Sequence, residues 1–514
     1  MVNARKLIRD SGAVFTNSFV SSSVCCPSRA TFQTGLYPHN NGVFANGGDM
    51  GGAPTFVSKG NESKGFAPLL QQAGYETAWF GKWMNGNSGP DLAFHRPQGW
   101  SDIAICNDPR LNCYEGYDYT LNFNGQSEPH GHKPSDYMTD VVSDKGQRFI
   151  EQIAQQERVK PTAVEKPFLL NLAVTAPHLP IKGAPRDRGN PWCQQALPNF
   201  SGYLEADVSD KPTWLSSTVR MRARRAKLWA PRDYRNRMCS LLAADRMIGK
   251  IIDTLRDTGE LSNTYLIFTS DNGYNNGAHD LIHKMVPYED SLRVPLAVAG
   301  PNIQAGVRRD EIVLNNDLAP TFLDLAGLPA PEAMDGMSIG PLLMSGSGRT
   351  SWPRKLFLGE LKGGEASALN QEDVSDGGTP TVAGVAAEIP PHYLRQVPQY
   401  ALAVDVPDWR MVRTDRYKYI EWYQLPCELA KQQGARNRCI HEYELYDLAS
   451  DPNELDNLLD THTGRVSDRY QLSPARRVML TRVKRVLQER LQQLGACGGA
   501  SCREDESRSP MERN

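Results

Sequence analysis

The chain has 514 residues, of which 40% are hydrophobic and 23% are charged, and its 57 Lys and Arg against 59 Asp and Glu leave a formal net charge of −2. This composition is typical of a soluble globular protein with a large buried core, and the near-neutral net charge implies neither nucleic acid nor a membrane surface as a partner. No apolar run approaches the length of a membrane-spanning helix, and the segment Met1–Lys6 does not begin a secretory signal peptide.

The first predicted elements are a strand and a helix that meet at a cysteine. The segment Ala13–Val20 has a β-type, partly apolar composition, and Arg29–Leu36 is compatible with a helix that Pro27 could begin. Cys25 therefore falls at the junction, where backbone N–H groups and the helix dipole favour an anion and would lower the pKa of a thiol. Arg29 could turn back toward Cys25. The alternative is that this cysteine and its neighbour are small buried residues near a turn.

Further along the chain, apolar runs that end in polar residues alternate with helical patterns. The clearest helix is Leu241–Thr258, where apolar residues fall on one face and Gly259 follows as a stop. This alternation predicts an α/β fold with a large, mostly parallel sheet, helices on both of its faces and the site at the carboxyl ends of the strands. The predicted strands are Thr77–Phe80, Phe168–Val174, Tyr265–Thr269 and Leu296–Ala299.

Polar side chains follow three of these strands. Lys82 comes after the first strand, His178 after the second, and Asp271 and Asn272 after the third. The oxygen atoms of Asp271 and Asn272 suit a hard cation such as Ca²⁺ or Mg²⁺. Taken singly, each residue has an ordinary interpretation as a solvated lysine, a structural histidine or an Asp-Asn-Gly turn.

The composition changes in the last third of the chain. Gly363–Pro391 is rich in Gly, Ala, Ser and Pro, which is typical of a long loop or insertion. Short β-like pieces follow, and then a helix with Ser473 as N-cap, Pro474 in its first turn and Gly495 as its stop. Residues beyond Cys502 are polar, and we expect them to be disordered. The β-like pieces are Trp409–Val412, Tyr417–Tyr423 and Tyr443–Leu448. The expected division is 1–345 for the larger α/β domain, 346–495 for a smaller α+β domain and 496–514 for a polar tail.

Ten cysteines are many for a cytosolic enzyme. With Cys25 and Cys26 set aside, the other eight form three close pairs and one remaining pair, which predicts a disulfide set. Asn61–Ser63 and Asn199–Ser201 match the glycosylation sequon, although such triplets also arise by chance. Together these features favour the secretory pathway. The expected disulfides are Cys106–Cys113, Cys193–Cys239, Cys427–Cys439 and Cys497–Cys502.

The run Cys25–Arg29 (CCPSR), followed by Thr34–Gly35, resembles the signature of the sulfatase family, in which the first cysteine is oxidised to formylglycine. Gly74–Trp83 is similar to the family's second signature and Ser270–Gly273 to its metal-binding segment. The resemblance spans roughly Arg5–Asn457 and is closest to the subgroup of N-acetylglucosamine-6-sulfatases, extracellular endosulfatases and algal-type arylsulfatases. It implies an alkaline-phosphatase-like fold. Further matching segments are Ala176–His178, His279–Pro295, Arg413–Ile420 and Glu444–Leu448.

The resemblance implies that a formylglycine-generating enzyme converts Cys25, and that the hydrated aldehyde then attacks the sulfur of a sulfate ester. Asp271 and Asn272 would bind one Ca²⁺ or Mg²⁺ ion together with the modified Cys25. Family members carry two further ligands, paired aspartates at the end of a first core strand upstream of the cysteine. Asp10 is the only aspartate before Cys25 in this chain, and it is not part of a pair. We therefore expect that the first core strand is missing and that the chain is truncated.

The resemblance also implies which side chains handle the sulfate. His279 is a further candidate for contact with the substrate. The family often places a histidine two residues after its first sulfate-binding lysine, where this chain has Met84; relatives that act on glucosamine 6-sulfates also lack that histidine. The groups that would bind the sulfuryl oxygens or assist the leaving alcohol are Arg29, Lys82, His178 and Lys284.

We therefore expect a sulfuric ester hydrolase that acts on an aryl or sugar sulfate in an extracellular, cell-wall or lysosomal location, with no nucleic acid partner and no transmembrane segment. One alternative is a noncatalytic sulfoglycan-binding relic of the fold, which the missing aspartates and Met84 favour. A second is a phosphatase or phosphodiesterase of the same superfamily, whose members usually carry a Ser or Thr nucleophile and two zinc ions. The CCPSR run and the two lysines argue against the second alternative.

Overall fold

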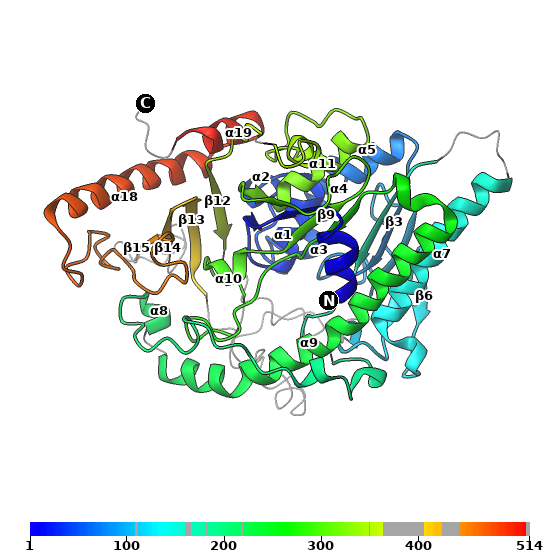
Figure 1. The fold of residues 1–514 in the computed structure, drawn as a ribbon, viewed down its shortest axis with the longest axis horizontal. Helices are drawn as coiled ribbons and strands as arrows, with labels where there is room; N and C mark the ends of the chain where they lie inside the picture. Colours follow the sequence, from blue (N-terminus) through cyan, green and yellow to red (C-terminus); the bar gives the residue numbers. More distant parts are fainter. Residues whose placement is uncertain are drawn as a thin grey trace.

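The computed structural model describes residues 1–107, 112–159, 166–180, 182–216, 219–282, 284–348, 350–362, 406–423 and 441–509, with the side chains of 157–159, 219–225 and 441 left out. An α/β body occupies one side of the molecule, and an antiparallel sheet with a long helix occupies the other (Figure 1). Within the described residues, no helix combines the length and the apolar character needed to cross a membrane.

A five-stranded sheet forms one half of the α/β body, in the order β6-β5-β4-β3-β7. The strands β3, β4 and β7 are parallel, and β5 and β6 continue the sheet antiparallel. On one face lie α7 (Met138–Val159) and α9 (Val219–Thr258), and on the other lie α1 (Cys25–Thr34), α5 (Phe66–Gln72) and α11 (Leu318–Leu325). The predicted covering of both sheet faces by helices is therefore present. The strands are β3 Glu76–Gly81, β4 Asp102–Cys106, β5 Thr120–Phe123, β6 Gln126–Pro129 and β7 Phe168–Ala173.

A second sheet of four strands has the order β10-β1-β9-β8. In this sheet β9 runs antiparallel to both β1 and β8, so the body mixes parallel and antiparallel pairs in two sheets instead of forming one continuous sheet. The strands are β1 Ala13–Phe15, β8 Leu266–Phe268, β9 Leu296–Ala299 and β10 Val307–Arg309, with a separate pair of β2 Ser18–Phe19 and β11 Val313–Leu314. Shorter elements are η1 Ala4–Arg9, α2 Pro38–Asn41, α3 Gly52–Ser58, α4 Asn61–Lys64, α6 Asn112–Glu115, η2 Pro134–Asp136, η3 Pro185–Asp187, η4 Pro191–Gln194, α8 Thr213–Ser216, η5 Glu260–Asn263, α10 Glu289–Leu292, η6 Asn315–Asp317 and α12 Gly340–Met344.

The edges of the two sheets face one cavity of about 1240 Å³. Each of the strands β7 and β8 has a neighbour on one side only, and all of their residues line this cavity and are half-buried. The cavity continues to His178 and Asp271, beyond the carboxyl ends of the two strands. The expectation of a further core strand stays a prediction.

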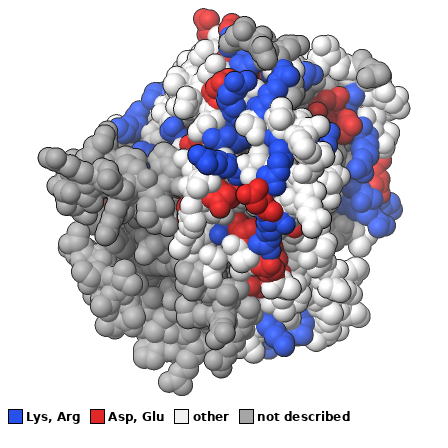
Figure 2. Space-filling view, turned by 90° about the vertical axis from the view of Figure 1, so that its left-hand side faces the viewer, with Lys and Arg blue, Asp and Glu red and all other residues white. Residues whose placement is uncertain are grey.

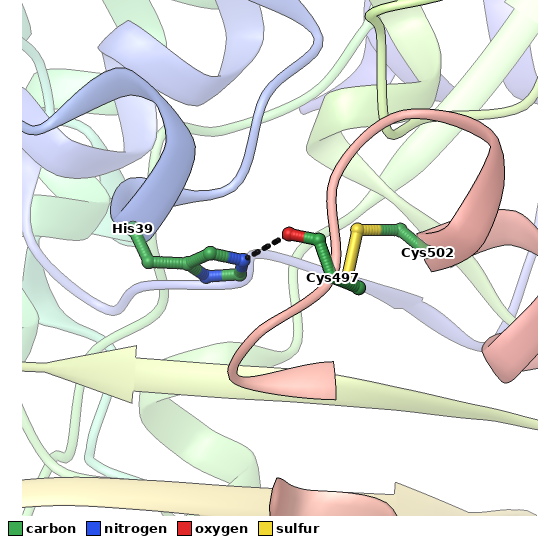
Figure 3. Close-up of side chains that lie close together, drawn as sticks. All are labelled: His39, Cys497 and Cys502. Atoms are coloured by element: carbon green, nitrogen blue, oxygen red, sulfur yellow. Dashed lines mark hydrogen bonds between the residues drawn. A yellow bond between two sulfur atoms is a disulfide. The ribbon is translucent and has the colours of Figure 1, made fainter. Parts of the chain in front are cut away.

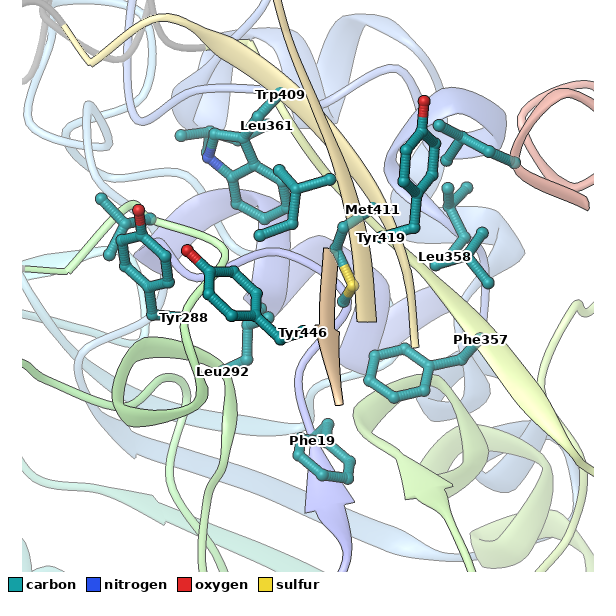
Figure 4. Packing of buried hydrophobic residues seen from close by; sticks show 14 of the residues in the cluster. Phe19, Tyr288, Leu292, Phe357, Leu358, Leu361, Trp409, Met411, Tyr419 and Tyr446 are labelled. Carbon is teal, nitrogen blue, oxygen red and sulfur yellow. The ribbon is translucent and has the colours of Figure 1, made fainter. Parts of the chain in front are cut away.

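An antiparallel sheet of four strands, β12-β13-β14-β15, packs against the α/β body. Phe19 of β2 stacks on Phe357 of β12 with 5.0 Å between ring centroids. Figure 4 shows these two rings with Tyr288, Trp409 and Tyr446 in the same hydrophobic cluster. One continuous core therefore joins the two parts, and the domain limits at 345 and 495 stay predictions. The strands are β12 Leu356–Leu361, β13 Asp408–Thr414, β14 Tyr417–Tyr423 and β15 His441–Asp447.

The predicted helix near the end of the chain is confirmed as α18 (Pro474–Leu494). The hydroxyl of Ser473 accepts a hydrogen bond from the backbone N–H of Arg476 at 3.2 Å, which satisfies one of the free donors of the first turn. The face of the molecule at this end carries Lys and Arg with Asp and Glu among them (Figure 2). Charges of both signs on one surface are typical of a solvated face.

The prediction of disorder after Cys502 is wrong for α19 (Ala500–Ser507), which packs on the body beside α18. Glu506 is completely buried, and its Oε2 accepts from Nε of Arg354 at 2.9 Å. A disulfide between Cys497 and Cys502 closes the loop before this helix. The polar composition misled the prediction because the partner of Glu506 lies 152 residues away in the chain.

Three of the four predicted disulfides are present, and the predicted pair Cys427–Cys439 lies outside the described residues. The two sequons differ. Asn61 is 0% exposed and donates to the carbonyl of Asn41 at 2.8 Å, whereas Asn199 is exposed. The geometry therefore permits a glycan at Asn199 and not at Asn61.

Candidate active site

Cys25 is the first residue of α1. The preceding Val24 is extended, and Gly35 ends the helix in the left-handed region at φ 71°, a conformation that glycine adopts without strain. Cys25 is 1% exposed, and the dipole of α1 favours a negative charge at its first turn. The predicted position at the start of a helix is confirmed, with the helix beginning two residues before Pro27.

The ammonium group of Lys284 contacts the Cys25 thiol. Its Nζ lies 2.9 Å from Sγ of Cys25 and 3.2 Å from Oδ1 of Asn272. Burial by itself raises the pKa of the thiol, but Lys284 and then Lys82 outweigh burial and lower the pKa of Cys25 well below its usual value. Position 25 is therefore a place where the protein stabilises a negative charge.

Arg29 links three elements of the site. It lies one turn after Cys25, and its Nε donates to Oδ2 of Asp271 at 2.9 Å while Nη1 donates to the carbonyl of Lys82 at 2.8 Å. Burial alone would raise the pKa of the Asp271 carboxyl, but Arg29, Lys82 and Lys284 hold that pKa far below its usual range. Asp271 therefore stays charged, and α1, the end of β3 and the segment after β8 are held together.

Lys82 directly follows β3 and is 4% exposed. Its Nζ has no hydrogen-bond partner among the described residues and lies 5.2 Å from the ring centroid of Tyr114. A buried ammonium group without an acceptor costs free energy, which indicates that an anion from outside the chain completes its contacts. Tyr114 was missed in the sequence; its place next to Cys113 of a predicted disulfide is the signal that could have found it.

His178 follows β7, and its ring lies near enough to the Cys25 thiol for each group to affect the pKa of the other. The ring packs on Tyr114 with 4.6 Å between centroids. Because a carbonyl oxygen only accepts, the 2.5 Å contact between Nδ1 and the carbonyl of Leu179 places the ring hydrogen on Nδ1. Burial, and after it Lys284, lowers the pKa of His178. The imidazole is therefore neutral at neutral pH, and its other nitrogen can accept a proton.

The structure does not bring His279 to this cluster. Its Nδ1 lies 2.7 Å from Oε2 of Glu205, and its ring packs on Tyr288 with 4.2 Å between centroids. Burial lowers the pKa of His279 to about 3 and raises that of Glu205 to about 8, so the pair is uncharged near neutral pH. His279 lines a second cavity of about 310 Å³, and its contact with a substrate stays a prediction.

The residues near Cys25 supply few ligands for a hard cation. Oδ2 of Asp271 already accepts from Arg29, and Oδ1 of Asn272 accepts from Lys284. Calcium takes about six to eight oxygen ligands, whereas Asp271 and Asn272 offer one carboxylate and one amide, beside the ammonium group of Lys284. The described side chains therefore do not complete a divalent metal site by themselves.

One group of described residues elsewhere has the spacing of metal ligands: His39, Cys497 and Cys502 (Figure 3). The two sulfur atoms are joined in a disulfide, so neither is available as a thiolate. Nε2 of His39 lies 3.1 Å from the carbonyl of Cys497, and Nδ1 lies 2.6 Å from Oε1 of Glu360. Burial lowers the pKa of His39, but the Glu360 carboxylate outweighs burial and raises it. The group fastens the end of the chain to α2 and does not form a metal site.

Comparison with known proteins gives one family. A sequence model of that family, described as Sulfatase, matches residues 2–328. The extracellular sulfatase SULF-1 homolog of Drosophila melanogaster is 35% identical over 374 residues, which are 72% of this chain and 32% of the relative. The N-acetylglucosamine-6-sulfatase of Homo sapiens is 30% identical over 511 residues, which are 97% of this chain and 81% of the relative. The chain thus spans about a third of the Drosophila protein, and 46% of a similar Caenorhabditis elegans protein.

Solved structures agree with the fold. A protein solved in complex with its substrate D-glucosamine-2-N,6-O-disulfate superposes with a TM-score of 0.65 at 23% identity, covering 100% of this chain and 94% of that one. A 2-O glycosaminoglycan sulfatase superposes with a TM-score of 0.58 at 17% identity, covering 98% and 91%. The predicted fold class, an alkaline-phosphatase-like α/β body with a smaller sheet domain at the carboxyl end, is confirmed.

Proposed function

The chain belongs to the sulfatase family, and from that premise we propose that it hydrolyses the sulfate ester of a sulfated sugar, with Cys25 matured to formylglycine as the nucleophile. The observation that carries the proposal is the convergence on Cys25 of Lys284, His178, Lys82 and Arg29, which come from four separate parts of the chain. This arrangement matches an anion-transfer reaction centred on the side chain at position 25.

Three cations are placed to neutralise a transferring sulfuryl group. Lys284 contacts position 25 directly, and Arg29 is held against Asp271. Lys82 is the most informative of the three, because its buried ammonium group has no acceptor within the described chain. A sulfate oxygen would supply that acceptor. Preorganised charges of this kind lower a barrier because they are already oriented when charge develops on the oxygens.

His178 can carry the proton that the reaction moves. Its Nδ1 hydrogen is directed to the Leu179 carbonyl, which leaves the other ring nitrogen of the neutral imidazole as the proton acceptor. The neutral ring can therefore take the proton from an attacking hydroxyl at position 25. The imidazolium formed in this way can then donate the same proton to the leaving sugar oxygen, so that no alkoxide is released.

Formylglycine supplies, as its hydrate, the hydroxyl group that attacks sulfur. Sulfatases generally use a divalent metal ion as well, and we propose Asp271 and Asn272 as two of its ligands, with Ca²⁺ or Mg²⁺ as the ion. These two oxygens do not complete a coordination shell, and further oxygen ligands are needed. The steps above are therefore assigned only to the chain's own side chains.

The proposed substrate class is a sulfated glycan, and an N-acetylglucosamine 6-sulfate is the first one to test. The human relative, which this chain matches along 97% of its length, is named for that substrate. The position two residues after Lys82 is Met84, which is 3% exposed and accepts a weak hydrogen bond from Gln33 at 3.8 Å. A methionine there packs with α1 and takes no part in proton transfer.

We propose the secretory pathway as the compartment of the protein. Three disulfides lie among the described residues, and two of the similar proteins are named extracellular sulfatases. The exposed Asn199 is the proposed glycan site. A formylglycine-generating enzyme is the proposed maturation partner.

The test is hydrolysis of N-acetylglucosamine 6-sulfate by the protein expressed with a formylglycine-generating enzyme. The matched variant is Cys25→Ala, which removes the nucleophile. Sulfate release by the parent and none by the variant would support the proposal. If the parent releases no sulfate but binds the sulfated sugar, and position 25 remains a plain cysteine, the noncatalytic sulfoglycan-binding alternative replaces it.

A further inference from the structure

Arg237 is a cation of α9 that lies outside the Cys25 cluster. Its Cζ is 3.9 Å from the ring centroid of Tyr274, and its Nη1 is 3.5 Å from Oδ1 of Asn276, which is long for a hydrogen bond. Among the described residues, no carboxylate forms an ion pair with this guanidinium group. Arg237 is half-buried and is one of the residues that line the large cavity.

Asp233 is the acidic residue nearest to Arg237 on the same helix, one turn earlier, and the two side chains form no ion pair. Burial raises the pKa of Asp233 to about 6 although Arg237 and Arg232 act in the opposite direction, so most of this carboxyl is charged at neutral pH and attracts Arg237 without contacting it. Burial lowers the pKa of Arg237. The guanidinium group is therefore desolvated without a directly paired carboxylate.

The position of Arg237 relates it to the proposed reaction centre. Tyr274, on which it stacks, comes directly after the segment Asp271–Gly273, and the N–H of Gly273 donates to the carbonyl of Ser291 at 2.9 Å, which fixes this segment. The same cavity is lined by Arg237 and by Lys82, His178 and Lys284. A sugar with its ester at Cys25 would therefore extend along a wall that carries a second, weakly compensated positive charge.

The second cavity, of about 310 Å³, lies next to the large one. Tyr274 lines both cavities. The second cavity is also lined by the aromatic rings of Phe200 and Tyr234, by the amides of Asn276 and Asn453, and by the carboxylates of Glu289, Asp290 and Glu454. Aromatic rings and amide groups suit the apolar faces and hydroxyl groups of a sugar ring, whereas the carboxylates disfavour an anion. An oxyanion would therefore bind beside Arg237, which lines the large cavity.

We propose that Arg237, Tyr274 and Asn276 form a subsite for a second oxyanion of the glycan, an N-sulfate or a uronate carboxylate, beside the sulfate ester that is cleaved. This inference rests on the proposed function and makes its substrate class narrower: a glycan with at least two negative charges instead of a monosulfated sugar or an aryl sulfate. The planar guanidinium group suits such an oxyanion because it can donate two parallel hydrogen bonds to sulfate or carboxylate oxygens.

An arginine stacked on a tyrosine often has only a structural role. The experiment must therefore distinguish a structural role of Arg237 from binding of an oxyanion. The variants are Arg237→Met, Arg237→Lys and, as a matched control, Arg235→Met, which changes an exposed arginine on the same helix. The substrates are glucosamine 2-N,6-O-disulfate, N-acetylglucosamine 6-sulfate and a uronate-containing disaccharide whose glucosamine carries only the 6-sulfate. The measured quantity is the ratio of kcat/KM for each doubly charged substrate to that for N-acetylglucosamine 6-sulfate.

We expect Arg237→Met to lower this ratio roughly 10- to 100-fold, as the loss of hydrogen bonds to a charged group would do. The ratio for Arg237→Lys should lie between the ratios for Arg237→Met and the parent. Arg235→Met should leave the ratio unchanged. A fall for the disulfated sugar alone identifies the N-sulfate, and a fall for the disaccharide alone identifies the carboxylate. Equal losses on all three substrates would show a structural role and overturn the proposal.

A second measurement does not depend on turnover. Calorimetry with the Cys25→Ala variant, with and without Arg237→Met, gives the dissociation constants of glucosamine N-sulfate and of glucosamine, neither of which has a 6-sulfate. Weaker binding of the N-sulfate alone after Arg237→Met supports the subsite even if the parent releases no sulfate. If Arg237→Met leaves the binding of glucosamine N-sulfate unchanged, the N-sulfate is not the ligand of this subsite. If it also leaves the binding of the disaccharide unchanged in the same assay, the subsite is rejected.

Discussion

Replacing Lys284 by alanine tests the electrostatic core of the account. Its Nζ lies 2.9 Å from Sγ of Cys25, and at an effective dielectric constant of about 20 two unit charges at that separation interact by about 6 kcal/mol. Water that enters the vacated space and the remaining Lys82 recover part of this energy. The net loss expected for one preorganised contact is about 3 kcal/mol of barrier, or about a hundredfold in kcat.

The assay is kcat and KM for N-acetylglucosamine 6-sulfate, with the formylglycine content of each preparation measured so that rates refer to matured protein. Lys59→Ala is the matched control, because Lys59 is an exposed lysine outside the site. A folded Lys284→Ala protein that keeps more than about a third of the parent kcat would refute the reasoning, because removal of one preorganised contact of this type lowers kcat by much more than that. The same result for Lys59→Ala and Lys284→Ala would refute it as well.

Three further predictions concern pH and stability. Because burial lowers the pKa of His178 below its ordinary value of about 6.5, kcat/KM should stay level on acidification to that pH and fall only below it; an acid limb that begins above that value would contradict the proton assignment. Burial raises the pKa of Glu444 to about 7 from 4.5, so its contribution to stability is complete below the lower value and is lost as the pH rises to 7. Glu444→Gln should remove up to about 3 kcal/mol of this pH dependence in denaturant titrations, and an unchanged pH profile would count against it. Cys502→Ser opens the disulfide to Cys497 and should cost about 2 kcal/mol, with faster proteolysis at α19; a variant as resistant as the parent would contradict the role given to this loop.

Local signals in the sequence predicted local structure well. Ser473 and Pro474 mark the start of α18, and Tyr417–Tyr423 has the bounds of β14. In both segments the residues that determine the element are neighbours in the chain, either as a cap followed by a helical run or as a short run rich in aromatic side chains. The three observed disulfides were found for a similar reason, since two of them join cysteines only 5 and 7 residues apart.

Long-range partners were harder to predict. Glu506 lies in a polar segment that reads as a disordered tail, and its buried ion pair with Arg354 becomes visible only when the chain is folded. His279 matched a family segment, yet Glu205 draws its ring into a second cavity. The split of the sheet beside β7 and β8 also could not be read from strand composition, because pairing partners are set by the topology.

The site itself was predicted in part. The structure brings Cys25, Arg29 and Lys284 together: the first two lie in the first turns of α1, and Lys284 lies in the segment between β8 and α10. Arg237 was not predicted, although it lies on a helix that the sequence identified. A helical pattern selects the apolar face, and it gives no indication that one arginine faces a cavity beside Tyr274.

The most direct test of the central claim is peptide mass spectrometry of the protein from its native source, covering the peptide that contains Cys25. The account predicts formylglycine at this position, because the site places Lys284, Lys82 and His178 around a reactive, negatively charged group. A plain or disulfide-bonded cysteine at position 25 in the mature protein would contradict it and leave a sulfatase fold that binds without hydrolysis.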